Sequence, residues 1–178
     1  MDSLQEGRIV SLRQPVRGDV EELLSLVSAS RSLHRPWVYP PSDERAFHAY
    51  VDRASSERFL GCLICLRQTG AIIGVANLSE VVRGIFQSAY LGFYGHADYA
   101  GRGLMREGLL LLLRHAFRVM RLHRIEANVQ PGNARSLTLV RSLGFRREGF
   151  SPKYLKIGGR WRDHQRWALL AEGYEPRA

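Results

Sequence analysis

The sequence is poor in two features that would tie the chain to a special environment: cysteine and long apolar runs. The 178-residue chain has two cysteines, and no uninterrupted apolar stretch approaches the ~20 residues of a membrane-spanning helix. Cys62 and Cys65 lie in one strand-like run. Positions three apart in a strand face opposite sides, so the two thiols suit neither a disulfide nor a shared metal ion. The N-terminus also lacks the basic-then-apolar layout of a signal peptide. We therefore expect reduced thiols in a cytoplasmic protein that does not use a membrane.

A metal-ligand set and internal repeats are missing as well. The six histidines, at positions 34, 48, 96, 115, 123 and 164, form no short-spaced group. No second cysteine cluster completes a zinc site. No repeat, low-complexity segment or linker divides the chain, and its length suffices for a substantial core. The sequence thus predicts a single domain over residues 1–178 without a metal.

Acidic residues are scarce in the second half of the chain. Residues 101–178 contain 16 Lys and Arg against 6 Asp and Glu, whereas residues 1–100 contain 10 against 11. The formal net charge of +9 therefore comes from the second half. Such a charge suits a polyanionic ligand, meaning a phosphorylated cofactor, a nucleic acid or an acidic protein. The alternative is arginines on solvent-facing surfaces, such as Arg114, Arg118 and Arg121, which share one stripe of a helix.

Hydrophobic periodicity and turn residues predict alternating strands and helices. Helices are expected to follow Asp19, Ser42, Gly103 and Asn133, and three of these residues carry side chains suited to capping. Strands are expected at residues 8–12, 59–67, 71–78, 86–95, 123–129, 146–156 and 160–171. The order is β-α-α-β-β-β-α-β-α-β-β, an α/β (mixed α+β) arrangement in which helices flank a mixed sheet.

The chain is organised around the stretch from Tyr90 to Met105, in which an aromatic strand feeds a long helix through a turn with two glycines, Gly101 and Gly103. Backbone N–H groups and the positive end of a helix dipole can hold phosphate at such a place. The functional interpretation is an anion cradle, and the alternative is a plain strand-to-helix turn.

An aromatic loop broken by prolines covers residues 34–41 and contains Trp37 and Tyr39. Loops of this kind often line ligand sites, although a buried tryptophan that only anchors the loop explains the pattern equally well.

Several ordered motifs make the chain resemble the GNAT superfamily of N-acetyltransferases, and the likeness covers essentially all of it. The helix-start frame is Ala100-Gly101-Arg102-Gly103-Leu104-Met105, in which Ala100 replaces a Gln or Arg and Met105 replaces a small residue. Met105 resembles the branch of ribosomal-protein-alanine N-acetyltransferases, RimJ-like and RimL-like. The same branch is suggested by Arg35-Pro36-Trp37, His123-Arg124-Ile125-Glu126-Ala127, Asn133-Ala134-Arg135-Ser136, Leu143-Gly144-Phe145-Arg146-Arg147-Glu148-Gly149 and Gly159-Arg160-Trp161-Arg162-Asp163-His164.

The resemblance implies a GNAT fold, with a mixed, mostly antiparallel sheet of about seven strands flanked by about four helices, and acetyl-CoA as cosubstrate. Backbone N–H groups of the turn would receive the pyrophosphate, and the pantetheine arm would pair like an extra strand where strands 86–95 and 124–130 splay apart. Asn133 would hydrogen-bond the arm. The implied cofactor-binding residues are Phe93, Tyr94, Gly95, Ala100, Gly101, Arg102, Gly103, Leu104, Met105, Asn133 and Ser136. Trp37 and Tyr39 would bind the acceptor substrate.

The residue that protonates the departing thiolate is the least settled part of this expectation. Many family members place a Tyr where this chain has Val140, which cannot donate a proton. In RimL-like members a Ser takes the role, and Ser136 stands at its place. Tyr154 is a second candidate acid, and Glu126 a candidate base acting through water, with an arginine ion pair as its alternative.

Three functions remain open at this point. The first is acetylation of the N-terminal α-amine of a protein such as a ribosomal protein, by a monomer or homodimer that does not require nucleic acid. The second is the same chemistry on a small amine such as an antibiotic, polyamine or amino-acid conjugate. The third is a non-catalytic acyl-CoA-binding module.

Overall fold

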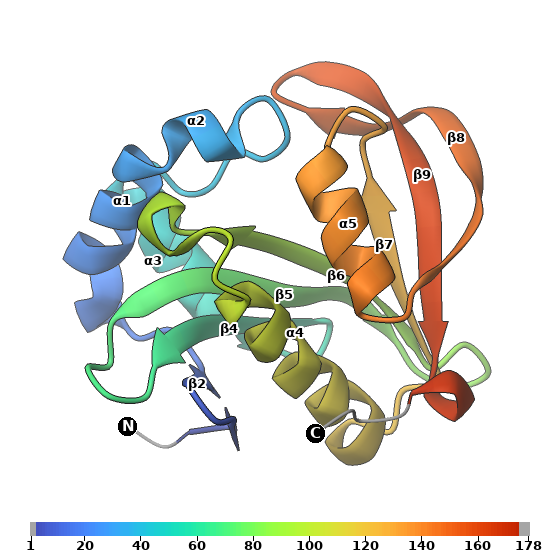
Figure 1. Cartoon of the computed structure of the whole chain (residues 1–178), viewed down its shortest axis with the longest axis horizontal. Coiled ribbons are helices and arrows are strands. Elements are labelled where there is room, and N and C mark those ends of the chain that lie inside the picture. The colour runs from blue at the N-terminus through green and yellow to red at the C-terminus, as the bar shows by residue number, and fades with distance from the viewer. Residues whose placement is uncertain (1–2, 175–178) are drawn as a thin grey trace.

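The computed structural model describes residues 3–174, and its centre is one twisted sheet (Figure 1). The strands are β1 (Gln5–Glu6), β2 (Val10–Arg13), β3 (Ser55–Ser56), β4 (Phe59–Leu66), β5 (Ile72–Val82), β6 (Ser88–Gly95), β7 (Arg124–Val129), β8 (Arg146–Ile157) and β9 (Arg160–Leu170). They pair in the order β1-β2-β4-β5-β6-β7-β9-β8, and β3 pairs with β4. Among these strands every paired set is antiparallel except β6 with β7. The expected mixed, mostly antiparallel sheet is thus confirmed.

The helices are α1 (Val20–Ala29), α2 (Arg31–His34), α3 (Glu44–Arg53), α4 (Leu104–Arg114) and α5 (Ala134–Ser142). Short 3-10 turns are η1 (Arg17–Asp19), η2 (Ala97–Tyr99) and η4 (Ala171–Gly173), and a π-helical turn, η3 (His115–Val119), continues α4. Within residues 3–174, no helix is both long and apolar enough to cross a membrane.

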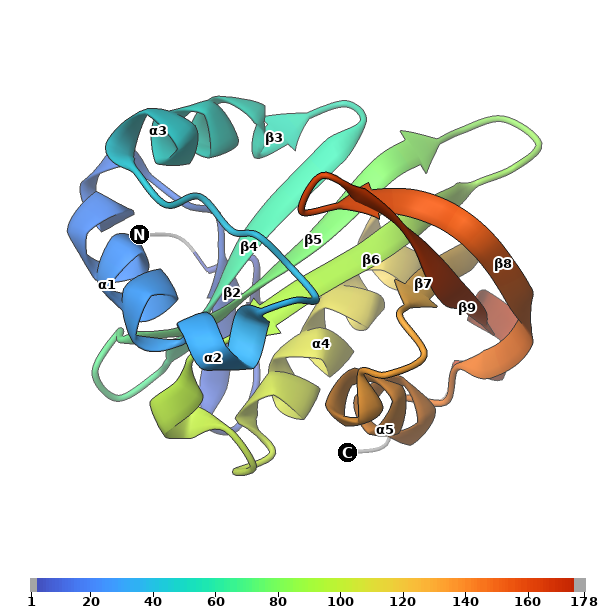
Figure 2. The same ribbon diagram turned by 90° about the horizontal axis from the view of Figure 1, so that it is seen from above.

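Two apolar clusters cover the two faces of the sheet. On one face α1 and α3 bury Leu23, Leu26 and Phe47 against β4 and β5. On the other face, the leucines of α4 and the apolar stripe of α5 form the larger cluster. Figure 2 shows α3 and α4 on opposite sides of β4 to β6.

The two cysteines follow this division of the sheet. Cys62 belongs to the cluster under α4, Cys65 belongs to the cluster under α1 and α3, and both are free thiols. Burial raises the pKa of Cys62 to about 12 and that of Cys65 to about 11. The predicted opposite orientation is confirmed, and both thiols stay protonated at neutral pH.

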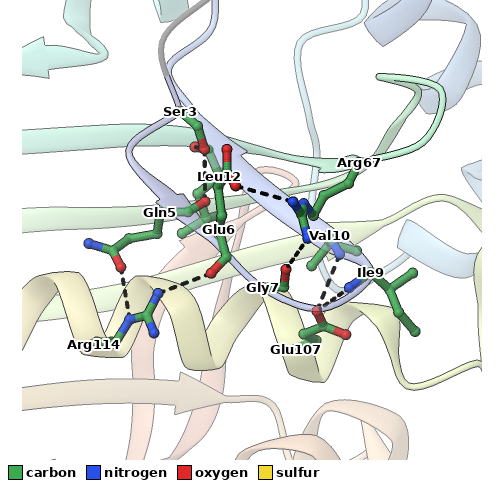
Figure 3. A network of polar contacts seen from close by, with 10 residues as sticks. All are labelled: Ser3, Gln5, Glu6, Gly7, Ile9, Val10, Leu12, Arg67, Glu107 and Arg114. Carbon is green, nitrogen blue, oxygen red and sulfur yellow. Dashed lines mark hydrogen bonds and ion pairs between the residues drawn. The ribbon is translucent and has the colours of Figure 1, made fainter.

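Polar side chains of α4 tie the N-terminal strands to the helix (Figure 3). One carboxylate oxygen of Glu107 accepts the N–H groups of Ile9 (2.7 Å) and Val10 (3.2 Å). Seven residues along, Arg114 donates to the Gln5 side chain (2.8 Å) and to the Glu6 carbonyl (3.1 Å). Arg114 is therefore partly buried in a contact with β1 and does not share a purely solvent-facing stripe with Arg118.

Some local expectations need correction. The sheet has nine strands where about seven were expected, because β1 and β3 are two-residue pairings without periodicity of their own. The side chain that caps α3 is Asp43, which accepts the Ala46 N–H at 2.8 Å, and not Ser42. Asp19 precedes α1 but makes no capping bond to it. Its carboxylate instead accepts hydrogen bonds from the two terminal guanidinium nitrogens of Arg13, each at 2.7 Å.

Candidate active site

The turn between η2 and α4 has the backbone shape that two glycines permit. Gly101 and Gly103 have φ of 78° and 77°, in the left-handed region that favours glycine. A Cβ added at either position would meet no atom within 4 Å, so the space above the turn is open. Gly103 is the N-cap residue of α4 and offers no side chain to the first N–H groups of the helix, which have no partner inside it. The turn therefore presents backbone donors at the positive end of a helix, where anions bind.

The residues around the turn divide between core and surface. Leu104 is buried, whereas Arg102 is exposed, with its guanidinium 5.6 Å from the centre of the Tyr99 ring. Ala100 uses its N–H within η2, donating to Ala97 O at 3.1 Å. The neighbouring Arg106 donates to the Ser142 carbonyl and links α4 to the end of α5.

Met105 has a packing explanation. A Cβ on Gly74 would overlap the Met105 sulfur, and one on Gly95 would lie 3.1 Å from its Cγ. Gly74 and Gly95 are paired across β5 and β6. The paired Gly74 and Gly95 thus leave room for the long Met105 side chain at the position where the helix-start motif of the GNAT superfamily has a small residue.

The parallel strands β6 and β7 part at the level of this turn (Figure 1). They pair only at three positions, Ser88 with Arg124, Ala89 with Ile125 and Tyr90 with Glu126. Beyond these, β6 stays paired with β5 as far as Gly95, and β7 stays paired with β9 as far as Val129. Beyond Tyr90 and Glu126 the two backbones no longer pair with each other, and we call the space between them the opening.

Backbone groups of β6 face this opening. The N–H of His96 donates to Ile73 O on the β5 side at 2.8 Å. Because backbone groups alternate in direction along a strand, those of Leu91, Phe93 and Gly95 point toward β7. The Gly95 carbonyl is 2.8 Å from His34 Nε2, whereas Leu91 and Phe93 lie beyond the last β6–β7 pair. Tyr94 directs its backbone toward β5 and buries its ring, and burial raises the pKa of its hydroxyl.

Helix α5 starts beside the opening. Its N-cap Asn133 accepts the Ser136 N–H through Oδ1 at 3.2 Å, so the predicted cap is confirmed. Ser136 is half-buried and lies four residues before the fully buried Val140, on the same face of the helix. Ser136 thus lies on the sheet-facing side of α5, one turn nearer the start of the helix than Val140.

Tyr154 and Glu126 lie on the opposite face of the sheet from α5. Ile125 and Ala127 pack into the cluster under α4 and α5, which places the alternating Glu126 on the other face. Tyr90, paired with Glu126, lies close to Tyr154: its pKa is raised to about 12, first by a hydrogen-bonding contact with the Tyr154 hydroxyl and then by burial. The structure therefore groups Tyr154 with Tyr90 and Glu126, and separates all three from Ser136.

Glu126 is held in an ion pair. Arg124 Nε donates to its carboxylate at 2.8 Å, and the same guanidinium contacts Glu148. Hydrogen bonds to these two carboxylates raise the pKa of Arg124, and Arg124 lowers the pKa of Glu148. The Glu126 carboxylate is therefore held against Arg124 on its own strand.

The loop after α2 crosses the opening. Trp37 O accepts from Gln130 Nε2 at 3.2 Å, and a Cβ on Gly132 would lie 3.0 Å from the Trp37 ring. The Tyr39 ring lies under the Arg35 guanidinium, 3.7 Å from it, and fills the space where a Gly158 side chain would be. The loop thus reaches from the β7–α5 connection to the β8–β9 turn (Figures 1 and 2).

The sequence profile of the acetyltransferase (GNAT) domain family matches residues 10–146. This chain is a member of the GNAT family.

Individual relatives agree with this assignment. Over 105 residues, 59% of this chain, it is 47% identical to the ribosomal protein uS5-alanine N-acetyltransferase of Escherichia coli. That match spans 54% of the relative, so the chain aligns with about half the length of this protein. The probable N-acetyltransferase YjcK of Bacillus subtilis is 30% identical over 93% of this chain and 96% of its own length. The structure of Mycobacterium smegmatis RimJ in complex with CoA-disulfide superposes with a TM-score of 0.84, at 29% identity, over 92% of this chain and 82% of that one. The resemblance to the RimJ/RimL-like branch and the GNAT fold are thereby confirmed.

Three residues of this GNAT domain were not singled out from sequence as site residues. Arg135 lines a cavity of about 300 Å³ beside the glycine turn, together with Ser32, Leu33, Ala97 and Ala100. The chain contains many arginines, so the sequence alone did not separate Arg135 from the arginines on the surface. Ser30, between α1 and α2, contacts Ala97 just after β6, and His34, in α2, contacts Gly95 at the end of β6; no motif places them there.

A larger hollow of about 740 Å³ lies along α3, among Asp43, Glu44, Arg45, His48, Ala49 and Asp52. It is open, and three carboxylates line it against one arginine, so it does not suit a phosphorylated ligand. Within residues 3–174, no group of three or more histidine, cysteine or carboxylate side chains has the arrangement of a metal site.

Proposed function

We propose that this GNAT domain, residues 1–178, transfers the acetyl group of acetyl-CoA to the N-terminal α-amine of a protein, with a ribosomal protein as the candidate acceptor. The observation that carries the proposal is the open glycine turn beside the parted strands β6 and β7. The similarity to the uS5-alanine N-acetyltransferase supports the choice of acceptor. A cytoplasmic location, where ribosomal proteins are made, belongs to the same proposal, and monomer or homodimer remains a prediction.

Binding follows from backbone geometry. The N–H groups of residues 101–105 would receive the pyrophosphate, so Ala100 in place of Gln or Arg removes a side chain and none of these donors. Arg102 and Arg135 stand at the turn with charges of the right sign. The backbone of Phe93 would pair with the pantetheine arm in the opening, and its N–H would polarise the thioester carbonyl.

Acetyl-CoA supplies the acetyl group as a thioester, and the chain's own residues must orient the amine and stabilise the departing sulfur. Ser136 approaches the opening from α5 and can donate a hydrogen bond to that sulfur. Tyr154 lies with Tyr90 and Glu126 on the face of the sheet opposite α5 and is the alternative donor. Asn133 uses its oxygen to cap α5, which leaves its amide group to contact the arm.

The position of Glu126 favours one class of amine. Its carboxylate accepts from Arg124 Nε at 2.8 Å and would have to leave this partner to reach an amine, so we expect the acceptor to bind in its neutral form. An N-terminal α-amine, with a pKa of roughly 8, is neutral in a substantial fraction of molecules near pH 7.5, whereas an amine with a pKa of roughly 10.4 is about 0.1% neutral. This difference supports an α-amine over a lysine side chain or a polyamine.

The test uses labelled acetyl-CoA and matched acceptors. One peptide carries the N-terminal sequence of ribosomal protein uS5 starting at alanine, its control has the same sequence with a blocked N-terminus, and the third acceptor is spermidine. Label in the free peptide alone supports the proposal. Label in spermidine but not in either peptide replaces it with small-amine acetylation. Binding of acetyl-CoA without transfer to any acceptor indicates a binding module.

A further inference from the structure

Two buried polar side chains from the α1–α2 segment hold the end of β6. His34 is 3% exposed, and its Nε2 lies 2.8 Å from Gly95 O. Ser30 is fully buried, and its Oγ accepts the Ala97 N–H at 2.9 Å. These two bonds fix the backbone on both sides of His96, at the point where the strand ends and the glycine turn approaches.

The hydrogen bond from His34 takes the place of the backbone donor that a paired neighbouring strand would supply to Gly95 O. Gly95 O points toward β7, but β6 and β7 pair only as far as Tyr90. Gly95 is half-buried, and a carbonyl that is shielded from water and has no donor costs stability; the imidazole supplies the donor. Because a carbonyl can only accept, Nε2 carries the proton. Nδ1 has no hydrogen-bond partner among the described residues, and the ring packs edge-on against Tyr94 at 5.2 Å.

The same residue also anchors the loop over the opening. The His34 carbonyl accepts the N–H of Trp37 at 2.8 Å and that of Val38 at 2.9 Å. Its side chain therefore contacts the strand that faces the cofactor, and its backbone starts the loop that faces the acceptor. Ser30, one helical turn earlier, contacts only the strand side.

We propose that His34 and Ser30 are positioning residues: Ser30 fixes the approach to the glycine turn, and His34 sets the cofactor strand and the acceptor loop relative to each other. The inference rests on the proposed function, because it assigns the strand and the loop to the two substrates.

The first experiment measures acetyl-CoA affinity by calorimetry, which needs no acceptor. His34→Ala is expected to weaken binding roughly tenfold to a hundredfold, since it leaves Gly95 O without a donor. His34→Gln places an amide N–H near the position of Nε2 and should restore affinity to within about threefold. His115→Ala is the matched control, because His115 is a partly buried histidine at the far end of α4. Equal loss in His115→Ala, or no rescue by glutamine, overturns the proposal.

Ser30→Ala supplies a milder variant should His34→Ala fail to fold, with the exposed Ser28→Ala as its control. Ser30→Ala should weaken acetyl-CoA binding severalfold and leave the peptide KM unchanged, whereas His34→Ala should also raise the peptide KM. Unchanged affinity in Ser30→Ala contradicts the role of Ser30, and an unchanged peptide KM in His34→Ala contradicts the link to the loop. If no acceptor is found, the proposed function fails, and the affinity measurements still decide whether these residues position the cofactor strand.

Discussion

A pair of substitutions at Gly103 separates the charge of the turn from its shape. Gly103→Ala places a Cβ in open space, so its cost is the left-handed φ of 77°, about 1–2 kcal/mol of stability. Gly103→Asp bears the same strain, but a carboxylate at a helix N-terminus recovers about 0.3–1 kcal/mol. The aspartate variant should therefore be at least as stable as the alanine variant.

Acetyl-CoA affinity should show the reverse order. A carboxylate about 4 Å from one phosphate charge opposes binding by about 4 kcal/mol at an effective dielectric of 20, close to a thousandfold. We expect Gly103→Ala to bind acetyl-CoA within about tenfold of the unmodified protein, and Gly103→Asp to lose measurable affinity. Calorimetry gives the affinities and thermal unfolding gives the stabilities. Equal affinity in the two folded variants would refute the anion cradle.

Three further predictions concern the acid, the loop and pH. Ser136→Ala should lower kcat about 10²-fold with little change in acetyl-CoA affinity, because the hydroxyl acts on the departing sulfur. An unchanged kcat in Ser136→Ala together with a strongly reduced kcat in Tyr154→Phe would assign the acid role to Tyr154. Trp37→Ala should raise the acceptor KM more than the acetyl-CoA KM in steady-state kinetics, and an equal rise in both would make Trp37 a packing anchor for the whole domain. Urea unfolding should show the free energy of unfolding falling as pH drops below about 6.5, by at most about 1.4 kcal/mol per pH unit for each histidine whose pKa is lowered in the folded chain. The physical reason is that burial lowers the pKa of His34, His115 and His164, so the unfolded chain takes up protons first, and a pH-independent stability from pH 7.5 to 5.5 would contradict it.

The strand–turn–helix unit could be predicted from sequence because its signals are local. Gly101 and Gly103 adopt the left-handed conformation that their identity allows, and α4 follows with a dense apolar stripe. The Asn133 cap and the opposite orientation of Cys62 and Cys65 depend on short-range rules of the same kind.

Features that local propensity and capping rules do not decide were missed. The strands β1 and β3 are two residues long and exist only as pairings, so no periodicity marks them. Ser42 and Asp43 both suit an N-cap, and only the backbone geometry selects Asp43. Asp19 is drawn away from α1 by Arg13, a partner that local capping rules do not consider.

The candidate site shows the same limit. The sequence left Ser136 and Tyr154 as alternative acids and Glu126 as a candidate base, but only the sheet shows that Ser136 lies on the α5 side and the other two on the opposite face. The ion pair of Glu126 with Arg124 joins neighbours two apart on one strand face, and it was an open alternative. The contact between His34 and Gly95 spans 61 residues and has no sequence signal.

The central claim is that the glycine turn and the parted strands hold acetyl-CoA, and a crystal structure of the complex with CoA tests it most directly. We expect the pyrophosphate on the backbone N–H groups of residues 101–105 and the pantetheine arm between β6 and β7, paired with Phe93. CoA bound elsewhere, for example in the hollow along α3, with nothing between β6 and β7, would contradict the account.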